Sequence, residues 1–254
     1  MGDGKGDDGL EQEINRRVAE RIGALKSILD GRDDMLSVAA HEIRTPLASL
    51  RLYLDALIKA AERGALDPVE SGVRLRKAQR QCDRLNILLN NLLDVARSPV
   101  RPLSVATEPV DLIVVIKSVC DRLRDQFAHQ GRALDVVAPI GTLTGDWDRT
   151  RLEQVLTNLV SNAHKHAPGA SARVEVVVRE GERVAVTVSD SGPGIKLELR
   201  ERLFERGATP PKSGGMGLGL WIVSQIVNAF GGTVRLDSGA PGTSITFELP
   251  RRAA

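Results

Sequence analysis

The feature that most constrains the fold is a pair of apolar seams spaced at three and four residues. Each seam runs for three heptads or more, which is typical of helices that bury one stripe against other helices. The first seam comprises Leu36, Ala40, Ile43, Leu47, Leu50, Leu54, Leu57 and Ala61, and the second comprises Leu75, Ala78, Cys82, Leu85, Leu89, Leu92 and Ala96. A short turn over 62–68 separates them, so the pattern predicts an antiparallel helical hairpin.

One hairpin cannot cover both of its stripes well, whereas two hairpins can cover each other. We therefore expect a homodimer through the helical hairpin over 32–98, with a four-helix bundle and Cys82 buried in it. The preceding segment, 10–31, has helical apolar spacing and is expected to transmit a signal. Residues 1–9 are rich in Gly and Asp and are expected to be a disordered leader.

The pattern changes after a proline-containing linker over 99–109, and a second domain is expected over 110–252. Helices are predicted over 111–129, 151–166 and 220–230, with Asp111 as the first cap. Strands are predicted over 133–138, 142–144, 174–178, 184–188, 233–236 and 243–249. Strands grouped with helices that can cover one face predict an α/β sandwich.

Composition excludes several classes of protein. A net charge of +2 over 254 residues gives no support to nucleic-acid binding. The two cysteines form no CxxC motif, so neither a zinc site nor a disulfide framework is expected, and a cytoplasmic location is the default. No stretch reaches the ~18 apolar residues of a membrane span, which leaves open whether a longer parent is membrane-anchored.

His41 lies one residue off the first seam, on a flank expected to face solvent. Glu42 follows it directly, and Thr45 is its neighbour one helical turn on. Pro46 removes the amide that would bond to the carbonyl of Glu42, which suggests that a kink or bending point of the helix beside His41 serves the function. A neutral imidazole nitrogen can attack phosphorus, and Glu42 is a plausible acceptor for the proton on the other nitrogen.

The segment 37–47, which contains HEIRTPL, closely resembles the H-box of sensor histidine kinases of two-component systems. The resemblance implies that His41 is the phosphoacceptor of a HisKA-type dimerisation domain. It also suggests, as a hypothesis, that Thr45 and Glu42 help a reverse, phosphatase reaction.

Three further motifs follow in the second domain. Asn158, Asn162 and Lys165 share one face of a helix, where amide oxygens suit Mg²⁺. Asp190 follows a predicted strand and begins a DxGxG turn, whose glycines let backbone approach a flat ligand. The glycine run 214–219 leads into a helix, where glycines suit an anion.

In order and spacing these motifs resemble the N, G1 and G2 boxes of the ATPase family shared by histidine kinases, DNA gyrase, mismatch-repair ATPases and a heat-shock chaperone. The resemblance implies a Bergerat-type (HATPase_c) α/β sandwich that binds ATP and Mg²⁺. It makes Asn162 the Mg²⁺ ligand with Asn158 assisting, Lys165 a phosphate contact, and Asp190 the adenine-reading acid. The other nucleotide-binding residues that it implies are His166, Gly192, Gly194, Ile195, Phe204, Gly215, Gly217, Leu218 and Gly219.

Some of these positions have particular roles or departures. Phe204 is expected to anchor an ATP lid over 195–216. His166 stands where relatives often carry Tyr, and His164 is expected at the surface without a role.

The implied function is autophosphorylation of His41, followed by transfer of the phosphoryl group to an aspartate of a response regulator receiver domain. One alternative is a mechanical ATPase of the same fold, such as a clamp or chaperone, which has no use for HEIRTPL. The other is a non-catalytic phosphotransfer or scaffold protein, which is not expected to keep intact nucleotide motifs.

Overall fold

The computed structural model describes residues 37, 39–97, 103–138, 141–205, 217–239 and 241–252. The predicted leader over 1–9, the predicted helix over 10–31 and Gly215 lie outside the described residues. The chain divides into two compact units, Met1–Leu85 and Asn86–Ala254, and the division falls inside one long helix.

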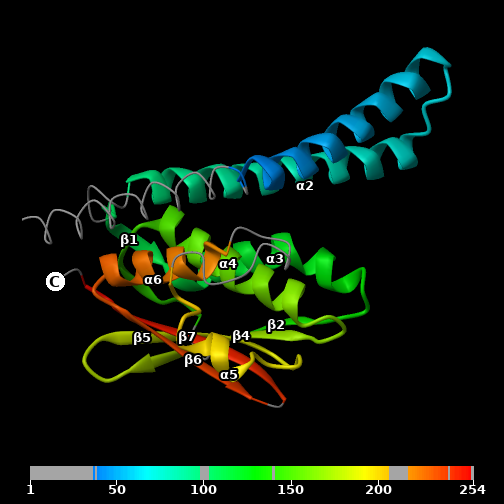
Figure 1. Ribbon diagram of the computed structural model, residues 1–254. Coiled ribbons are helices and arrows are strands. Elements are labelled where there is room, and N and C mark those ends of the chain that lie inside the picture. The colour runs from blue at the N-terminus through cyan, green and yellow to red at the C-terminus, as the bar shows by residue number, and fades with distance from the viewer. Residues whose placement is uncertain are drawn as a thin grey trace, which may run out of the picture. The chain divides into compact units, whose positions relative to one another are not determined.

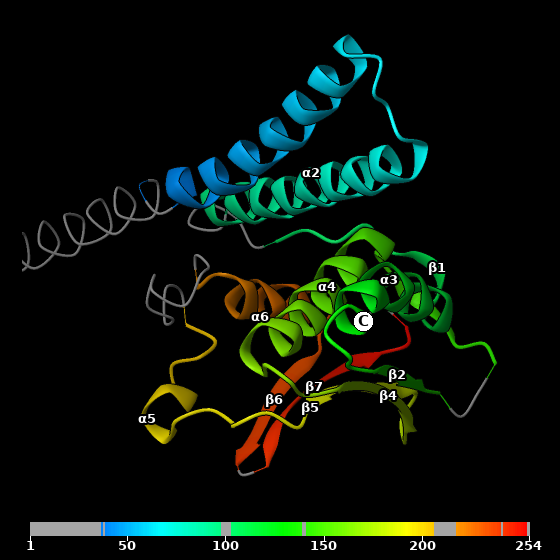
Figure 2. The same cartoon turned by 90° about the vertical axis from the view of Figure 1, so that its right-hand side faces the viewer.

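The first unit is a helical hairpin. Residues 39–62 are helical and the chain then turns into α2 (Pro68–Arg97), so that the two helices run antiparallel, as Figures 1 and 2 show. The start of α2 is capped by Asp67, whose Oδ1 accepts a hydrogen bond from the amide of Glu70 at 2.7 Å. Pro68 fits the first turn because its missing amide has no helical partner to lose.

The apolar seams of the hairpin are only partly buried within one chain. Ala39 is 3% exposed, whereas Ala40 and Cys82 are exposed in the single chain, so their expected burial in a dimeric bundle stays a prediction. The reason is geometric: a lone hairpin packs one side of each helix and leaves the other side outward. We call the outward apolar residues the outer seam: Leu47, Leu54, Leu75 and Leu89.

The second unit alternates helices and strands. Its helices are α3 (Leu112–Ala128), α4 (Arg149–His166), α5 (Leu197–Arg200) and α6 (Gly219–Ala229). Its strands are β1 (Glu108–Asp111), β2 (Leu134–Val137), β3 (Thr144–Trp147), β4 (Ala172–Arg179), β5 (Arg183–Asp190), β6 (Thr233–Gly239) and β7 (Gly242–Pro250). The fold class expected from the sequence, a helical hairpin followed by an α/β sandwich, is confirmed.

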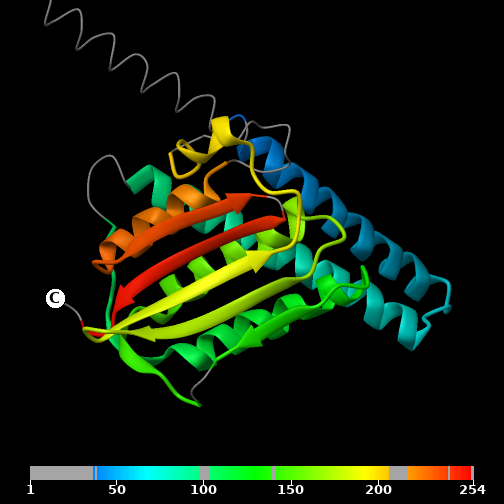
Figure 3. The ribbon, with the colours of Figure 1, turned by 90° about the horizontal axis from the view of Figure 1, so that it is seen from below.

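Five strands form the main sheet in the order β2-β4-β5-β7-β6, with β2 and β4 parallel and the other pairs antiparallel. Figure 1 shows α3, α4 and α6 on one face of this sheet, and Figure 3 shows the opposite face uncovered by helices. The layer between is mostly aliphatic, and it includes Leu152, Leu156 and Ile222 together with the aromatic Phe247, all fully buried. The absence of many aromatics is therefore met by close helix-on-sheet packing.

Two local features differ from the sequence predictions. The strand expected over 142–144 is β3, which begins at Thr144 and pairs with β1 in a separate two-stranded sheet. β1 was not predicted because it is short and contains Pro109, which argues against a strand. The helix expected from Arg151 begins at Arg149, because Asp148 caps it by accepting from the amide of Arg151 at 3.1 Å.

Candidate functional site

His41 is exposed on the first helix of the hairpin, as its place off the seam predicts. The hydroxyl of Thr45 donates to the carbonyl of His41 at 3.4 Å, and Ser49 repeats this bond to the carbonyl of Thr45 at 3.1 Å. Such bonds to the preceding turn bend helices. Pro46 is buried between them and has no amide for the carbonyl of Glu42. Two independent devices therefore weaken helix regularity at this turn.

The carboxylate of Glu42 points across the hairpin rather than outward. Its Oε2 lies 3.6 Å from Nη2 of Arg84 on α2, and the Glu42 side chain is 13% exposed. The acid predicted to accept a proton thus has a cation beside it and a position fixed by the second helix.

The residues predicted to contact magnesium and phosphate lie on α4. Asn158 is 8% exposed, and its Nδ2 has no hydrogen-bond partner within the described part of the chain. A buried polar atom without a partner is costly, and a bound polar ligand is one way to satisfy it. Asn162 follows one turn later, and Lys165 lies exposed near the C-terminal end of the helix.

Asp190 ends β5 at the centre of the sheet, where it pairs in register with Ala172 and Thr243. Its Oδ1 accepts from the amide of Gly192 at 2.9 Å, which closes the turn. A Cβ on Gly192 would lie 2.5 Å from the Cβ of Ala167, so only glycine fits. The turn therefore packs directly on the end of α4.

His166 connects these two motifs electrostatically. Desolvation and the nearby charge of Lys165 lower its pKa below the usual 6.5, while Asp190 opposes that shift. The neutral imidazole is thus favoured, which suits stacking or hydrogen bonding beside a nucleotide base.

The third motif meets the first at the start of α6. Leu218 is buried as the N-cap residue, and a Cβ on Gly219 would lie 3.4 Å from Oδ1 of Asn158. α6 packs against α4. Gly217 precedes them with φ of +65°. The fold thus brings together residues from the N, G1 and G2 motifs, with Gly215 outside the described residues.

The exit from the G1 turn is anchored to the β6–β7 hairpin. Gly194 has φ of +75°, and a Cβ there would lie 2.5 Å from the carbonyl oxygen of Gly239. The amide of Ile195 donates to Oγ of the buried Ser238 at 2.8 Å. Sequence reasoning missed Ser238, because a lone serine near a turn carries no signal of its own. Phe204 lies farther on, half-buried after α5.

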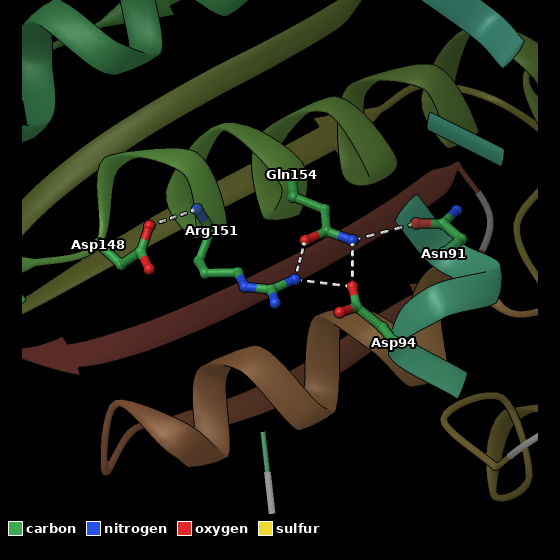
Figure 4. Close-up of polar contacts among 5 residues, drawn as sticks. All are labelled: Asn91, Asp94, Asp148, Arg151 and Gln154. Atoms are coloured by element: carbon green, nitrogen blue, oxygen red, sulfur yellow. Dashed lines mark hydrogen bonds and ion pairs between the residues drawn. The ribbon is translucent and has the colours of Figure 1, made fainter. Parts of the chain in front are cut away.

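Gln154 belongs to a different polar group from the asparagines on α4. Figure 4 shows it with Arg151, facing two residues of the last turns of α2. Its Nε2 donates to Asn91 at 3.1 Å and to Asp94 at 2.8 Å, while Nη1 of Arg151 reaches Asp94 at 2.7 Å. We call Asn91, Asp94, Arg151 and Gln154 the α2–α4 clamp.

The donor set fits a magnesium ion that arrives with a nucleotide. In the described part of the chain no three His, Cys, Asp or Glu side chains cluster as a metal site. The oxygens available are the amides of Asn158 and Asn162, and Mg²⁺ commonly takes few protein ligands together with phosphates and waters.

Comparisons with known proteins match both halves of the chain. Residues 31–99 match the family described as His Kinase A (phospho-acceptor) domain, and residues 147–253 match the Histidine kinase-, DNA gyrase B-, and HSP90-like ATPase family. The C4-dicarboxylate transport sensor protein DctB of Rhizobium meliloti (strain 1021) is 32% identical, over 96% of this chain and 40% of that protein. The signal transduction histidine-protein kinase BaeS of Escherichia coli (strain K12) is 32% identical, over 94% of this chain and 52% of that protein.

A solved structure is similar to this chain over most of its length. Full-length ShkA in complex with AMPPNP superimposes with a TM-score of 0.61 at 26% identity, over 87% of this chain and 46% of that chain. The chain thus spans about half the length of the curated relatives named above. Among the described helices, none combines the length and apolar character that a membrane crossing requires.

Proposed function

Because the chain belongs to the sensor histidine kinases of two-component systems, we propose that it transfers the γ-phosphoryl group of ATP to His41. The observation that carries the proposal is the convergence of three distant motifs: Asp190 and Gly192 pack on the end of α4, and Gly219 reaches Asn158. A scaffold without nucleotide chemistry has no need for this convergence.

His41 supplies the nucleophile. A neutral ring nitrogen attacks the γ-phosphorus, the bond between that phosphorus and the bridging oxygen breaks, and ADP leaves. The proton on the other ring nitrogen passes to a base. Glu42 is the proposed acceptor, and its contact with Arg84 keeps the carboxylate near the phosphoacceptor turn.

The second unit binds and orients the nucleotide. The carboxylate of Asp190 keeps one oxygen on the amide of Gly192 and offers the other to the exocyclic amine of adenine. Lys165 meets the phosphates, and His166, Ile195, Gly194, Gly217 and Leu218 line the site around the base and the phosphates. Positioning of this kind provides most of the catalysis in phosphoryl transfer.

Asn162 and Asn158 would hold Mg²⁺ through their amide oxygens. When bound, the ion neutralises charge on the phosphate oxygens and so stabilises the charge of the transition state. Nδ2 of Asn158, which has no hydrogen-bond partner among the described residues, supports a polar ligand at this helix face.

Two partners follow from the family. The outer seam leaves Leu47, Leu54, Leu75 and Leu89 outward, and a second hairpin of the same chain covers such a stripe in a four-helix bundle. The phosphoryl group then passes to an aspartate of a response regulator receiver domain. Thr45 and Glu42 are proposed to assist the reverse reaction, and a Thr45→Ala variant that kept full phosphatase activity would contradict that role.

The test is incubation with γ-labelled ATP and Mg²⁺, beside a His41→Gln variant and a parallel measurement of ATP binding. Acid-labile label on the wild type alone is the expected result. ATP binding without any label would favour the non-catalytic scaffold or the mechanical ATPase instead. Label retained on His41→Gln would place the phosphoacceptor elsewhere.

A further inference from the structure

Arg132 is the only arginine among the buried residues of the described chain, at 6% exposure. It follows the turn after α3. Its Nη1 donates to the carbonyls of His164 at 3.2 Å, Ala167 at 3.0 Å and Ala170 at 3.3 Å. This one nitrogen therefore binds a carbonyl in the last turn of α4 and two carbonyls in the segment that leads from α4 to β4.

The second terminal nitrogen binds on the other side. Nη2 contacts Nδ1 of His164 at 2.6 Å and donates to Oε1 of Gln130. The guanidinium also lies 5.1 Å from the ring centre of Phe127, which packs edge-on against His164 at 4.9 Å. His164, which was expected at the surface without a role, is half-buried and contacts this cluster.

No carboxylate lies within ion-pair distance of Arg132 in the part of the chain that is described. Its charge instead meets helix carbonyls, where the negative end of the α4 dipole stabilises a cation. Nε is buried and has no hydrogen-bond partner among the described residues. Burying an arginine in this way is expensive compared with an apolar side chain of similar volume. Stability alone therefore gives a poor account of this residue.

The segment that Arg132 binds, from His164 to Ala170, carries residues of the first nucleotide motif and packs against the second. Lys165 and His166 lie between two of its carbonyl partners in sequence. Ala167 is itself a partner, and its Cβ is the atom that a side chain at Gly192 would meet at 2.5 Å. The same guanidinium thus fixes the last turn of α4 and the surface that supports the Asp190 turn.

We propose that Arg132 is a positioning residue for nucleotide binding, which fixes the α4 end so that the N and G1 motifs face ATP together. The inference rests on the proposed kinase function. Arg132 acts through Ala167 and the carbonyl of His164 rather than by contact with ATP. Without it, binding energy from ATP must order the α4 end, so affinity falls while the bound complex still reacts.

The test compares Arg132→Met, Arg132→Lys and the control Arg173→Met, which removes an exposed arginine from neighbouring β4. KM for ATP and kcat of autophosphorylation are measured for each, together with direct binding of ATP and the urea midpoint. Arg132→Met is expected to raise KM and Kd about tenfold with kcat within about twofold, because misplaced binding groups are costly. Arg132→Lys keeps a cation at the helix end, and is expected to recover part of that loss.

The outcomes separate the possibilities. A lower apparent kcat at unchanged KM, in step with a lower urea midpoint, would mean that Arg132 only stabilises the fold. Unchanged KM, Kd and kcat would also overturn the proposal. Failure of the wild type to bind ATP would instead count against the proposed function itself, because Arg132 is unchanged in that protein.

Discussion

Nη1 of Arg151 lies 2.7 Å from Oδ2 of Asp94, so that the start of α4 is tied to the last turns of α2. The two side chains are only 20% and 5% exposed, respectively, and Gln154 bonds to both of them. A pair this well enclosed is screened little by solvent, and removing one member leaves the other charge poorly solvated.

We therefore expect Asp94→Ala and Arg151→Met each to destabilise the second unit. In the double variant the two losses are expected to fall short of additivity by about 1–2 kcal/mol, the coupling typical of contacting groups. Urea unfolding followed by tryptophan fluorescence measures this, since both tryptophans, Trp147 and Trp221, lie in that unit. Additive losses would show that the α2–α4 clamp contributes no coupling energy.

Asp190→Asn is expected to weaken ATP binding while it leaves the local turn intact. Asparagine keeps an oxygen for the amide of Gly192 but loses the charge that strengthens a hydrogen bond to adenine. Hydrogen bonds to charged groups contribute about 1.5–3 kcal/mol, so Kd should rise roughly 10- to 100-fold. Calorimetric titration with ATP measures this, with Asp237→Asn on exposed β6 as the control. Unchanged affinity would remove Asp190 from the base-reading role.

The outer seam predicts the oligomeric state. Leu54 and Leu89 are 43% and 52% exposed in one chain, and a charge at either is expected to prevent burial against a second hairpin. Leu54→Asp with Leu89→Asp should therefore yield monomers by light scattering coupled to gel filtration, while the wild type elutes as a dimer. Val114→Asp, at a residue 48% exposed on α3, should leave the dimer unchanged. A wild-type monomer at high concentration would contradict the four-helix bundle.

The two cysteines should differ in reactivity. Burial raises the pKa of the Cys120 thiol to about 11, so little thiolate exists at neutral pH, and the fully buried side chain is also out of reach of reagents. Cys82 is exposed in the single chain. Alkylation of the double Leu variant at pH 7.5 should therefore modify Cys82 within minutes and Cys120 only after denaturation, as peptide mass spectrometry can show. Equal labelling of both would mean that α3 opens readily.

The sequence was most informative where chemistry depends on neighbours in the chain. The phosphoacceptor motif, the cap at Asp111 and the glycine turn after Asp190 are all local patterns, and the fold and helix cap they predict are present. Roles for individual site residues stay predictions. Long-range partnerships were out of reach: Arg132 meets His164 from a distance of 32 residues, and nothing local distinguishes it from a surface arginine.

A second limit on prediction from the sequence was which face of a helix points into the hairpin. A seam with three-and-four spacing leaves the inward residue ambiguous by one position, and the single hairpin buries Ala39 rather than Ala40. Spacing identifies a stripe but not which part faces the same chain and which part faces a second copy. That distinction needs the packing partner, which no single sequence contains.

Pro46 gives the helix around His41 a mechanical property. A regular helix resists bending because bending stretches a backbone hydrogen bond on its convex side, but the bond to the carbonyl of Glu42 is already absent. Flexing the helix at this turn therefore strains one backbone bond fewer than in a regular helix. His41 thus lies one turn before a compliant point in the described helix over 39–62, so that bending there changes the direction of the reacting side chain relative to the rest of that helix.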